Sequence, residues 1–159
     1  MNRILLVLLL GISVSCVPGE GFSEQIDFKG ESWPTDRPAV FNLTVEDTIS
    51  RNDVFINIRN NNDYPFSNIF LISAIDFPAG NRIIDTLEYE MADKRGNWLG
   101  SGITDLKESK LFLKKGVVFP DKGSYRIEIR QAVRNLGDTQ PLENLPGIVG
   151  VGVSVESLK

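Results

Sequence analysis

From Ile26 onward, apolar residues alternate with polar residues in short runs that are separated by turn sequences. A period of two places every second side chain on the same face, which is typical of strands with one buried and one solvated face. The alternation favours antiparallel strands over a parallel sheet that is buried on both faces. The predicted strands are 39–45, 54–60, 68–77, 83–91, 111–119, 124–131 and 148–156, with weaker candidates at 26–28 and 102–106.

The run 124–131 shows the alternation clearly. Its apolar residues, at the odd-numbered positions from 125 to 129, are predicted to face the core. Arg126, Glu128 and Arg130 are predicted to face water. The preceding segment Pro120-Asp-Lys-Gly123 has the proline and glycine of a tight turn, so it is predicted to join two neighbouring strands.

The number and spacing of these runs predict an all-β protein. We expect a two-sheet antiparallel β-sandwich, either immunoglobulin-like or jelly-roll-like. The alternation does not determine the strand order. Residues 132–147 interrupt the pattern and are predicted to form a long connection with at most one helical turn.

Residues 1–15 have the features of an export signal. Arg3 supplies the positive charge, Ile4 to Val14 form an apolar run, and Ser13-Val14-Ser15 is a small-residue cleavage site. As a helix, the apolar run would cover roughly half of the ~30 Å hydrocarbon core of a bilayer, so a membrane span is not expected. We therefore predict a lipoprotein signal peptide over residues 1–15.

Cleavage after Ser15 would make Cys16 the first residue of the mature chain. The arrangement resembles a bacterial lipobox, in which the cysteine sulfur receives a diacylglyceryl group and the new N-terminus is acylated, typically with palmitate. Several acyl chains form a stable anchor where one is marginal. The alternative is ordinary secretion with a free thiol at Cys16. Residues 16–25 have the composition of a linker, and residues 26–159 are predicted to form the β-sandwich domain.

Composition argues against several classes of function. The chain has 159 residues, no histidine and one cysteine. Such a chain cannot form a Ser-His-Asp triad, a Cys-His pair, an internal disulfide or a zinc site built from histidines and thiolates. Its net charge is −4 and it has no basic run, so nucleic acid is not an expected partner. We expect no enzyme activity, no catalytic residue, no cofactor and no metal.

Carboxylates are the remaining candidates for chemistry. Glu88 and Glu90 would project from one strand face with Cβ atoms roughly 7 Å apart, a separation that two-carboxylate glycoside hydrolysis can use. That face is predicted to be solvated, where carboxylates make poor acids at neutral pH. A second candidate is a calcium site built from oxygen ligands in loops or at strand ends, namely Asn62, Asp63, Asp76 and Asp93.

Small residues gather on one face of the last predicted strand. Gly150, Gly152 and Ser154 alternate there with valines. Glycines within a strand indicate close packing or a ligand that approaches the backbone, and packing is the favoured interpretation.

Two tryptophans offer a binding hypothesis. Trp33 and Trp98 fall near predicted turns, where an exposed indole could stack on a sugar ring. They could equally close the ends of the sandwich core, and this second interpretation is favoured. Thr48 and Thr86 lie in Asp-Thr-apolar triplets that resemble the O-glycosylation site of exported Bacteroidetes proteins.

Three stretches of the second half, 85–102, 119–134 and 145–156, resemble the gliding-motility lipoprotein GldH family of Bacteroidetes. The middle stretch is the most specific, because an F-P-x-K-G-x-Y turn leads into a strand that ends in I-x-Q-A-x-R. In the last stretch, Gly150 stands where the family is expected to carry Asp. The resemblance extends over roughly residues 16–156.

This resemblance implies a lipoprotein of the outer membrane, on its periplasmic or surface face, that is required for gliding and associated with the type IX secretion machinery. It implies envelope proteins as partners and assigns one site residue, Cys16, as the lipid attachment site and membrane anchor. The leading hypothesis is a non-enzymatic component that acts by protein–protein contacts. The alternative is a surface glycan-binding lipoprotein that uses Trp33 and Trp98.

Overall fold

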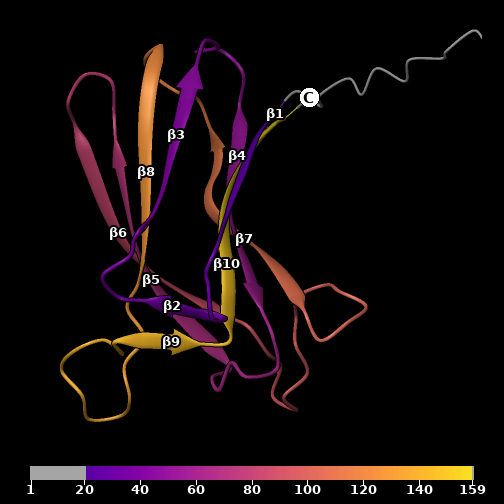
Figure 1. Ribbon diagram of the computed structural model, residues 1–159. Coiled ribbons are helices and arrows are strands. Elements are labelled where there is room, and N and C mark those ends of the chain that lie inside the picture. The colour runs from indigo at the N-terminus through magenta and orange to yellow at the C-terminus, as the bar shows by residue number, and fades with distance from the viewer. Residues whose placement is uncertain (1–20, 159) are drawn as a thin grey trace, which may run out of the picture.

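A computed structural model of the protein describes residues 21–158, which contain ten strands and no helix (Figure 1). No helix that could cross a membrane is therefore present among these residues. The strands are β1 (Gly21–Asp27), β2 (Ser32–Pro34), β3 (Ala39–Val45), β4 (Asn52–Asn60), β5 (Asn68–Asp76), β6 (Arg82–Glu90), β7 (Lys107–Val117), β8 (Gly123–Gln131), β9 (Asn144–Pro146) and β10 (Ile148–Ser157).

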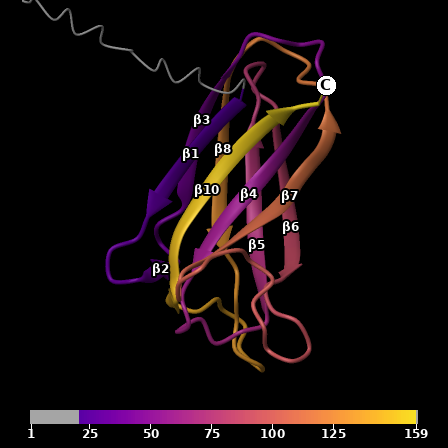
Figure 2. The same ribbon diagram turned by 90° about the vertical axis from the view of Figure 1, so that its right-hand side faces the viewer.

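The strands form two four-stranded sheets and one small two-stranded sheet. One large sheet has the order β1-β10-β4-β7, and the other has the order β3-β8-β5-β6. All pairs are antiparallel, including β2 with β9. Figure 2 shows the first sheet in front of the second. The predicted all-β fold with two antiparallel sheets in a sandwich-like arrangement is confirmed.

The strand order has the form of a jelly roll. The eight long strands make nested pairs, β1 with β10, β3 with β8, β4 with β7 and β5 with β6. Consecutive long strands therefore often lie in different sheets, as β3 and β4 do. This nesting distinguishes the jelly roll from the immunoglobulin-like sandwich, which was the other expected arrangement.

The core lies between the inner faces of the two large sheets. Inward side chains such as Ile56 and Val153 of the first sheet and Phe41, Leu71 and Ile127 of the second are almost completely buried. These residues occupy alternate strand positions, as the two-residue period requires. Burial of this apolar layer is the dominant favourable contribution to folding.

The connections divide the molecule into two ends (Figure 1). We call one the short-loop end: it carries the start of β1, the end of β10 and the loops 46–51, 77–81 and 118–122. We call the other the long-loop end: it carries the connections 28–38, 61–67, 91–106 and 132–147. The pair β2 and β9 lies within these long connections, at the bottom of Figure 1.

The first strand corrects the expected linker. Residues 21–25, predicted to belong to a linker over 16–25, are part of β1 and pair with β10. Composition suggested a linker because polar residues dominate the segment, but Phe22 and Ile26 pack against the core and fix it as an edge strand. Residues 16–20 of the expected linker lie outside the described residues.

Two further corrections concern the long connections. The weak strand predicted at 102–106 is absent, and the neighbouring Ser101 forms an isolated bridge with Glu108. The connection 132–147 contains strand β9 in place of the helical turn that was allowed for. The short strands β2 and β9 escaped prediction because each has three residues and ends in a proline, which weakens a strand pattern.

Glu128 was predicted to face water but is buried, with 5% of its surface exposed. It does project from the outer face of β8, as the alternation requires. Arg126 and Arg130 lie on the same face and bind both of its carboxylate oxygens, so their side chains cover it. Long arginine side chains commonly cover surface in this way.

Candidate functional site at the long-loop end

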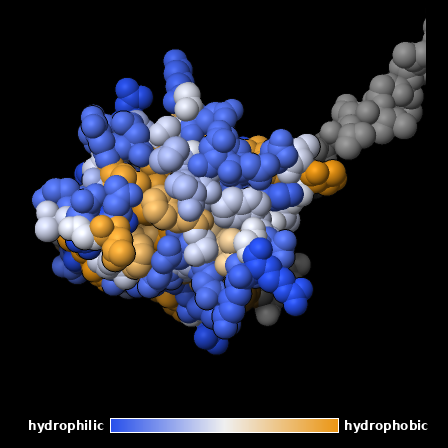
Figure 3. All heavy atoms as spheres, turned by 90° about the horizontal axis from the view of Figure 1, so that it is seen from below, coloured by the Kyte–Doolittle hydropathy of each residue, from blue (hydrophilic) through white to orange (hydrophobic). Residues whose placement is uncertain are grey.

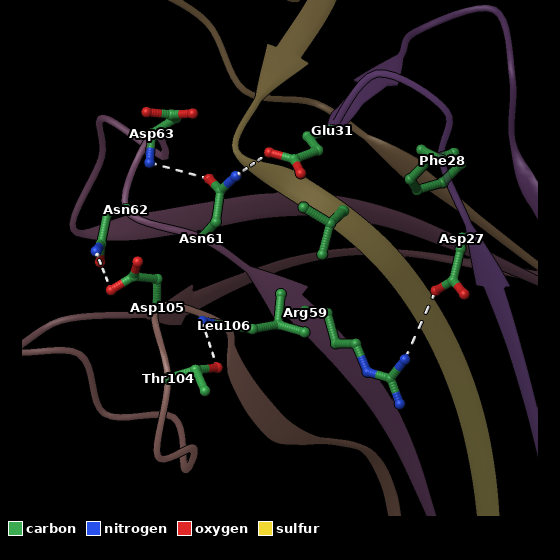
Figure 4. Close-up of a pocket in the computed structure, with 11 residues that line it drawn as sticks. Asp27, Phe28, Glu31, Arg59, Asn61, Asn62, Asp63, Thr104, Asp105 and Leu106 are labelled. Carbon is green, nitrogen blue, oxygen red and sulfur yellow. Dashed lines mark hydrogen bonds and ion pairs between the residues drawn. The ribbon is translucent and has the colours of Figure 1, made fainter.

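The candidate site is a hollow at the long-loop end with a volume of about 710 Å³ (Figure 4). The ends of β1 and β4 form its wall through Asp27 and Arg59. Three long connections complete it, with Glu31 from 28–38, the segment 61–63, and the segment 104–106. Segments far apart in the sequence meet here because all their strands end at the same edge of the sandwich.

The hollow is acidic. Four carboxylates line it, Asp27, Glu31, Asp63 and Asp105, against one cation, Arg59. Arg59 is already engaged, because its Nε lies 2.9 Å from Glu108 and its Nη1 lies 3.7 Å from Asp27. The surface therefore attracts positively charged groups.

Asparagines hold the loops of the hollow together. Asn61 Nδ2 donates to Glu31 at 2.6 Å, and Asn62 Nδ2 donates to Asp105 at 3.1 Å. The side-chain oxygen of Asn61 also accepts a hydrogen bond from the backbone N–H of Asp63 at 2.9 Å, which is an Asx turn. These bonds tie the connection 61–67 to its two neighbours and pre-form the hollow.

Aromatic residues support this end from inside. The Tyr64 ring is buried, and its hydroxyl donates to the carbonyl of Asn68 at 2.6 Å. Burial raises the pKa of Tyr64 well above its ordinary value. The half-buried Trp98 packs on Tyr64 with ring centroids 6.1 Å apart and donates from Nε1 to Asn62 at 3.2 Å. The rings thus hold the connections 61–67 and 91–106 against each other.

Exposed apolar side chains accompany the acidic hollow at this end. Ile103 and Leu136 are fully exposed, with relative exposures of 104% and 107%, and Leu99 and Leu106 are also exposed. Figure 3 views the molecule from this end and shows apolar surface to the left of the middle, bordered by polar side chains, and a separate apolar group at the right-hand edge. An apolar patch with a polar rim is the usual anatomy of a protein–protein interface.

The four calcium candidates do not converge. Asn62 and Asp63 line the hollow, whereas Asp76 lies at the end of β5, toward the short-loop end, and pairs with Arg82 at 2.9 Å. Asp93 lies in a turn and accepts hydrogen bonds from Asn97, which lower the pKa of Asp93. Among residues 21–158, no group of three or more acidic or thiol side chains is arranged to hold a metal.

The other candidates of the sequence analysis lie apart from the hollow. Glu88 and Glu90 project from the outer face of β6, and Glu88 accepts a hydrogen bond from Asn68 at 2.7 Å. Gly150 and Gly152 are covered by the side chain of Gln25, which would collide with any added Cβ atom, so close packing accounts for both glycines.

The tryptophans do not form an exposed platform. Trp33 is completely buried and stacks on Phe28 with centroids 5.3 Å apart, which agrees with a core position. Its Nε1 donates to the carbonyl of Arg37 at 2.8 Å. Because Trp98 also packs into the fold, the stacking surface on which the glycan-binding alternative depended is missing from the described part of the chain.

Of the three predicted modification sites, two lie among the described residues and one does not. Cys16, the expected lipid attachment site, lies outside the described residues, as does the signal peptide over 1–15. Thr48 is half-buried in the loop 46–51, and Thr86 is exposed on β6.

Most residues of the hollow were missed by sequence reasoning. Asp27, Glu31, Arg59 and Asp105 are single charged residues with no motif around them, and only the fold places them together. The polar run 60–63 was the one local signal, because successive asparagines and aspartate mark a loop that can organise its own backbone.

A sequence profile for a family described as "GldH lipoprotein" matches residues 20–155. The "Gliding motility lipoprotein GldH" of Flavobacterium johnsoniae is 43% identical over 155 residues, which cover 98% of this chain and 96% of that protein. A "Gliding motility lipoprotein GldH homolog" of Christiangramia forsetii is 48% identical over 124 residues, which cover 78% of this chain and 76% of that protein.

Among solved structures, the infectious bursal disease virus VP2 subviral particle covers 87% of this chain with 30% of its own chain, at 16% identity. The TM-score of this match is 0.33.

Proposed function

Because the chain belongs to the GldH lipoprotein family, we propose that it is a lipid-anchored, non-enzymatic component of the gliding motility or type IX secretion apparatus. In this proposal Cys16 carries the lipid, the outer membrane is the anchoring membrane, and the folded domain acts through contacts with envelope proteins. The names of the relatives support the link to gliding and to lipid anchoring.

The long-loop end is the proposed contact surface. The observation that carries this assignment is the combination of fully exposed Ile103 and Leu136 with the acidic hollow at the same end. Burial of exposed apolar side chains by a partner makes the free energy of binding more favourable, and the carboxylates select a partner with complementary charge. The partner segment should therefore carry Lys or Arg beside apolar residues.

Composition supports a non-enzymatic role. The whole sequence lacks histidine. The hollow at the long-loop end combines carboxylates with amides, and hydrogen bonds between these side chains hold its loops together. A surface that uses its polar groups to hold loops in place suits recognition.

Site-specific crosslinking in living cells tests the proposal. A photo-reactive amino acid is placed at Ile103 or Leu136 in the lipidated protein, with Asn42, an exposed position in the middle of β3, as the matched control. We expect envelope proteins, identified by mass spectrometry, to be captured from positions 103 and 136 and not from position 42.

Capture should weaken as ionic strength rises, because part of the attraction comes from exposed charges. Adducts of equal yield from all three positions, or none from positions 103 and 136, would contradict the assignment of the contact surface. Crosslinks only to proteins unrelated to motility or secretion would contradict the proposed process.

A further inference from the structure

The short-loop end carries a second set of exposed apolar side chains. Ile49 in the loop 46–51 is 86% exposed, Val118 in the loop 118–122 is 45% exposed, and Leu158 after β10 is 43% exposed. Isolated exposed apolar residues are ordinary. These three differ because they lie at the same end of the molecule, which is also the end at which the first strand starts.

A hydrogen bond joins the segments that carry two of them, Ile49 and Leu158. The backbone N–H of Leu158 donates to the carbonyl of Arg51, two residues after Ile49, at 2.8 Å. Gly21 at the start of β1 pairs with Glu156. A shallow hollow of about 620 Å³ joins these parts, lined by residues of β1, of both loops and of the end of β10, including Gly21, Phe22, Ser50, Phe119 and Ser157.

Chain length limits how far this end can lie from an anchor at Cys16. Five peptide units separate Cys16 from Gly21, and fully extended they span at most about 18 Å. Strand β10, with its 10 residues, extends roughly 30 Å toward the long-loop end. If the strands run perpendicular to the membrane plane, only the short-loop end is therefore within reach of the membrane.

The charges at this end favour apolar contact over electrostatic attraction. The loops 46–51 and 118–122 contain Glu46, Asp47 and Asp121 against Arg51 and Lys122, so their acidic and basic groups nearly balance. Such a surface is neither drawn to anionic lipids nor strongly repelled by them. Insertion of apolar side chains at the boundary between headgroups and acyl chains favours membrane binding whatever the lipid charge.

We infer that the short-loop end is a membrane-contact surface, with Ile49, Val118 and Leu158 inserted among the lipids while the long-loop end points away. This inference rests on the lipid anchor at Cys16 in the proposed function. In this inference, side chains of the folded domain contact the membrane and set the orientation of the domain, in addition to its attachment through the lipid at Cys16.

Tryptophan fluorescence tests the orientation. The two native tryptophans, Trp33 and Trp98, both lie at the long-loop end and serve as an internal background. The lipidated protein, purified from its native envelope, is reconstituted into phosphatidylcholine vesicles with brominated or ordinary acyl chains. The variants are Ile49→Trp and Val118→Trp, with Ile103→Trp as the matched control at the opposite end.

Bromine quenches tryptophan only at close range, so we expect the added emission of Ile49→Trp and Val118→Trp to fall at least about two-fold in brominated vesicles. The wild type and Ile103→Trp should be unchanged, and neither salt nor an anionic lipid should alter the result. Melting temperatures equal to that of the wild type establish that the variants fold. If one of the two short-loop variants fails to fold, quenching of the other is enough to test the inference.

The outcomes separate the two proposals. Protein that floats with vesicles but shows no quenching at positions 49 and 118 overturns the contact surface and leaves the anchor intact. Equal quenching at position 103 means that the domain lies flat and also overturns it. Protein that fails to float refutes the lipid anchor, and the orientation inference fails with it.

Discussion

Glu128 shows how a charged residue is accommodated on a covered part of the sheet surface. Its carboxylate lies 2.7 Å from Arg126 and 2.5 Å from Arg130. Burial by itself raises a carboxyl pKa, but the hydrogen bonds from the two guanidinium groups outweigh it, so the pKa of Glu128 lies below its ordinary value. Arg126 also contacts Asp76, which binds Arg82, and the charges form a ladder across β8, β5 and β6.

Replacing Glu128→Gln should lower the free energy of unfolding at pH 7 by about 1–2 kcal/mol, because two charge-assisted hydrogen bonds weaken while the exposed arginines partly recover solvent. The matched control is Glu90→Gln on the outer face of β6, where a solvated side chain changes stability by less than about 0.5 kcal/mol. Urea unfolding measures both values.

The same substitution has a predicted pH signature. Because the pKa of Glu128 is lower in the folded protein than in the unfolded chain, its contribution is fully present above the ordinary value near 4.5. It is lost as pH falls through the folded pKa. The stability gap between wild type and Glu128→Gln should therefore narrow below about pH 4.5; a constant gap down to pH 2 would contradict the role of the charge.

Gly147 controls how two long connections meet. It lies between β9 and β10 with a φ of 75°, a left-handed conformation that favours glycine. A Cβ atom at this position would lie 2.1 Å from the backbone nitrogen of Tyr64. The N–H of Asn61 donates to the carbonyl of Gly147 at 2.9 Å, so the glycine holds the loop that forms the acidic hollow.

Gly147→Ala should destabilise the protein by more than about 3 kcal/mol, since backbone strain of about 1–2 kcal/mol adds to a clash with another backbone segment. Gly30→Ala is the matched control, because Gly30 has a φ of 77° and nothing within 4 Å of an added Cβ atom. Gly30→Ala should lose only the stability that corresponds to the backbone strain. Thermal unfolding compares the two, and similar losses would argue against the close approach to Tyr64.

The elements were predictable where packing agrees with local pattern. Strand β3 has the predicted bounds, β5, β8 and β10 differ from prediction by one residue at one end, and β6 is displaced by one residue at both ends. Strand β1 was mistaken for a linker in part because Ser23 and Glu24 face water, and only the pairing with β10 shows that Gln25 covers Gly150 and Gly152. Edge strands and three-residue strands depend on partners that a local pattern does not contain.

At the scale of the whole molecule, the jelly roll separates two surfaces. Successive connections between the long strands alternate between the two ends, so the short connections lie at one end and the long connections at the other. The chain enters β1 at the short-loop end, so an anchor before Gly21 leaves the long-loop end free for partners. The hollow and its apolar neighbours then face away from the proposed membrane contact.

Cys16→Ala should move the protein from the envelope membrane fraction to the soluble periplasmic fraction and abolish its function in gliding, because the acyl chains are the proposed anchor. Its fold should be retained, since residues 21–158 form both sheets. Fractionation with immunoblotting measures the first effect and thermal unfolding of the released protein measures the second. Unchanged membrane retention would refute Cys16 as the lipid site.

The sequence by itself determined the all-β class and the faces of most strands, and it predicts an anchor at Cys16, because alternation and export signals are local and extend over a few residues. Only the tertiary structure decided the nested strand order, the burial of Glu128 between two arginines, and the meeting of Asp27, Glu31, Asp63 and Asp105 in one hollow. The reason is physical: strand pairing and loop packing join residues tens of positions apart, and their free energy depends on which surfaces meet in space.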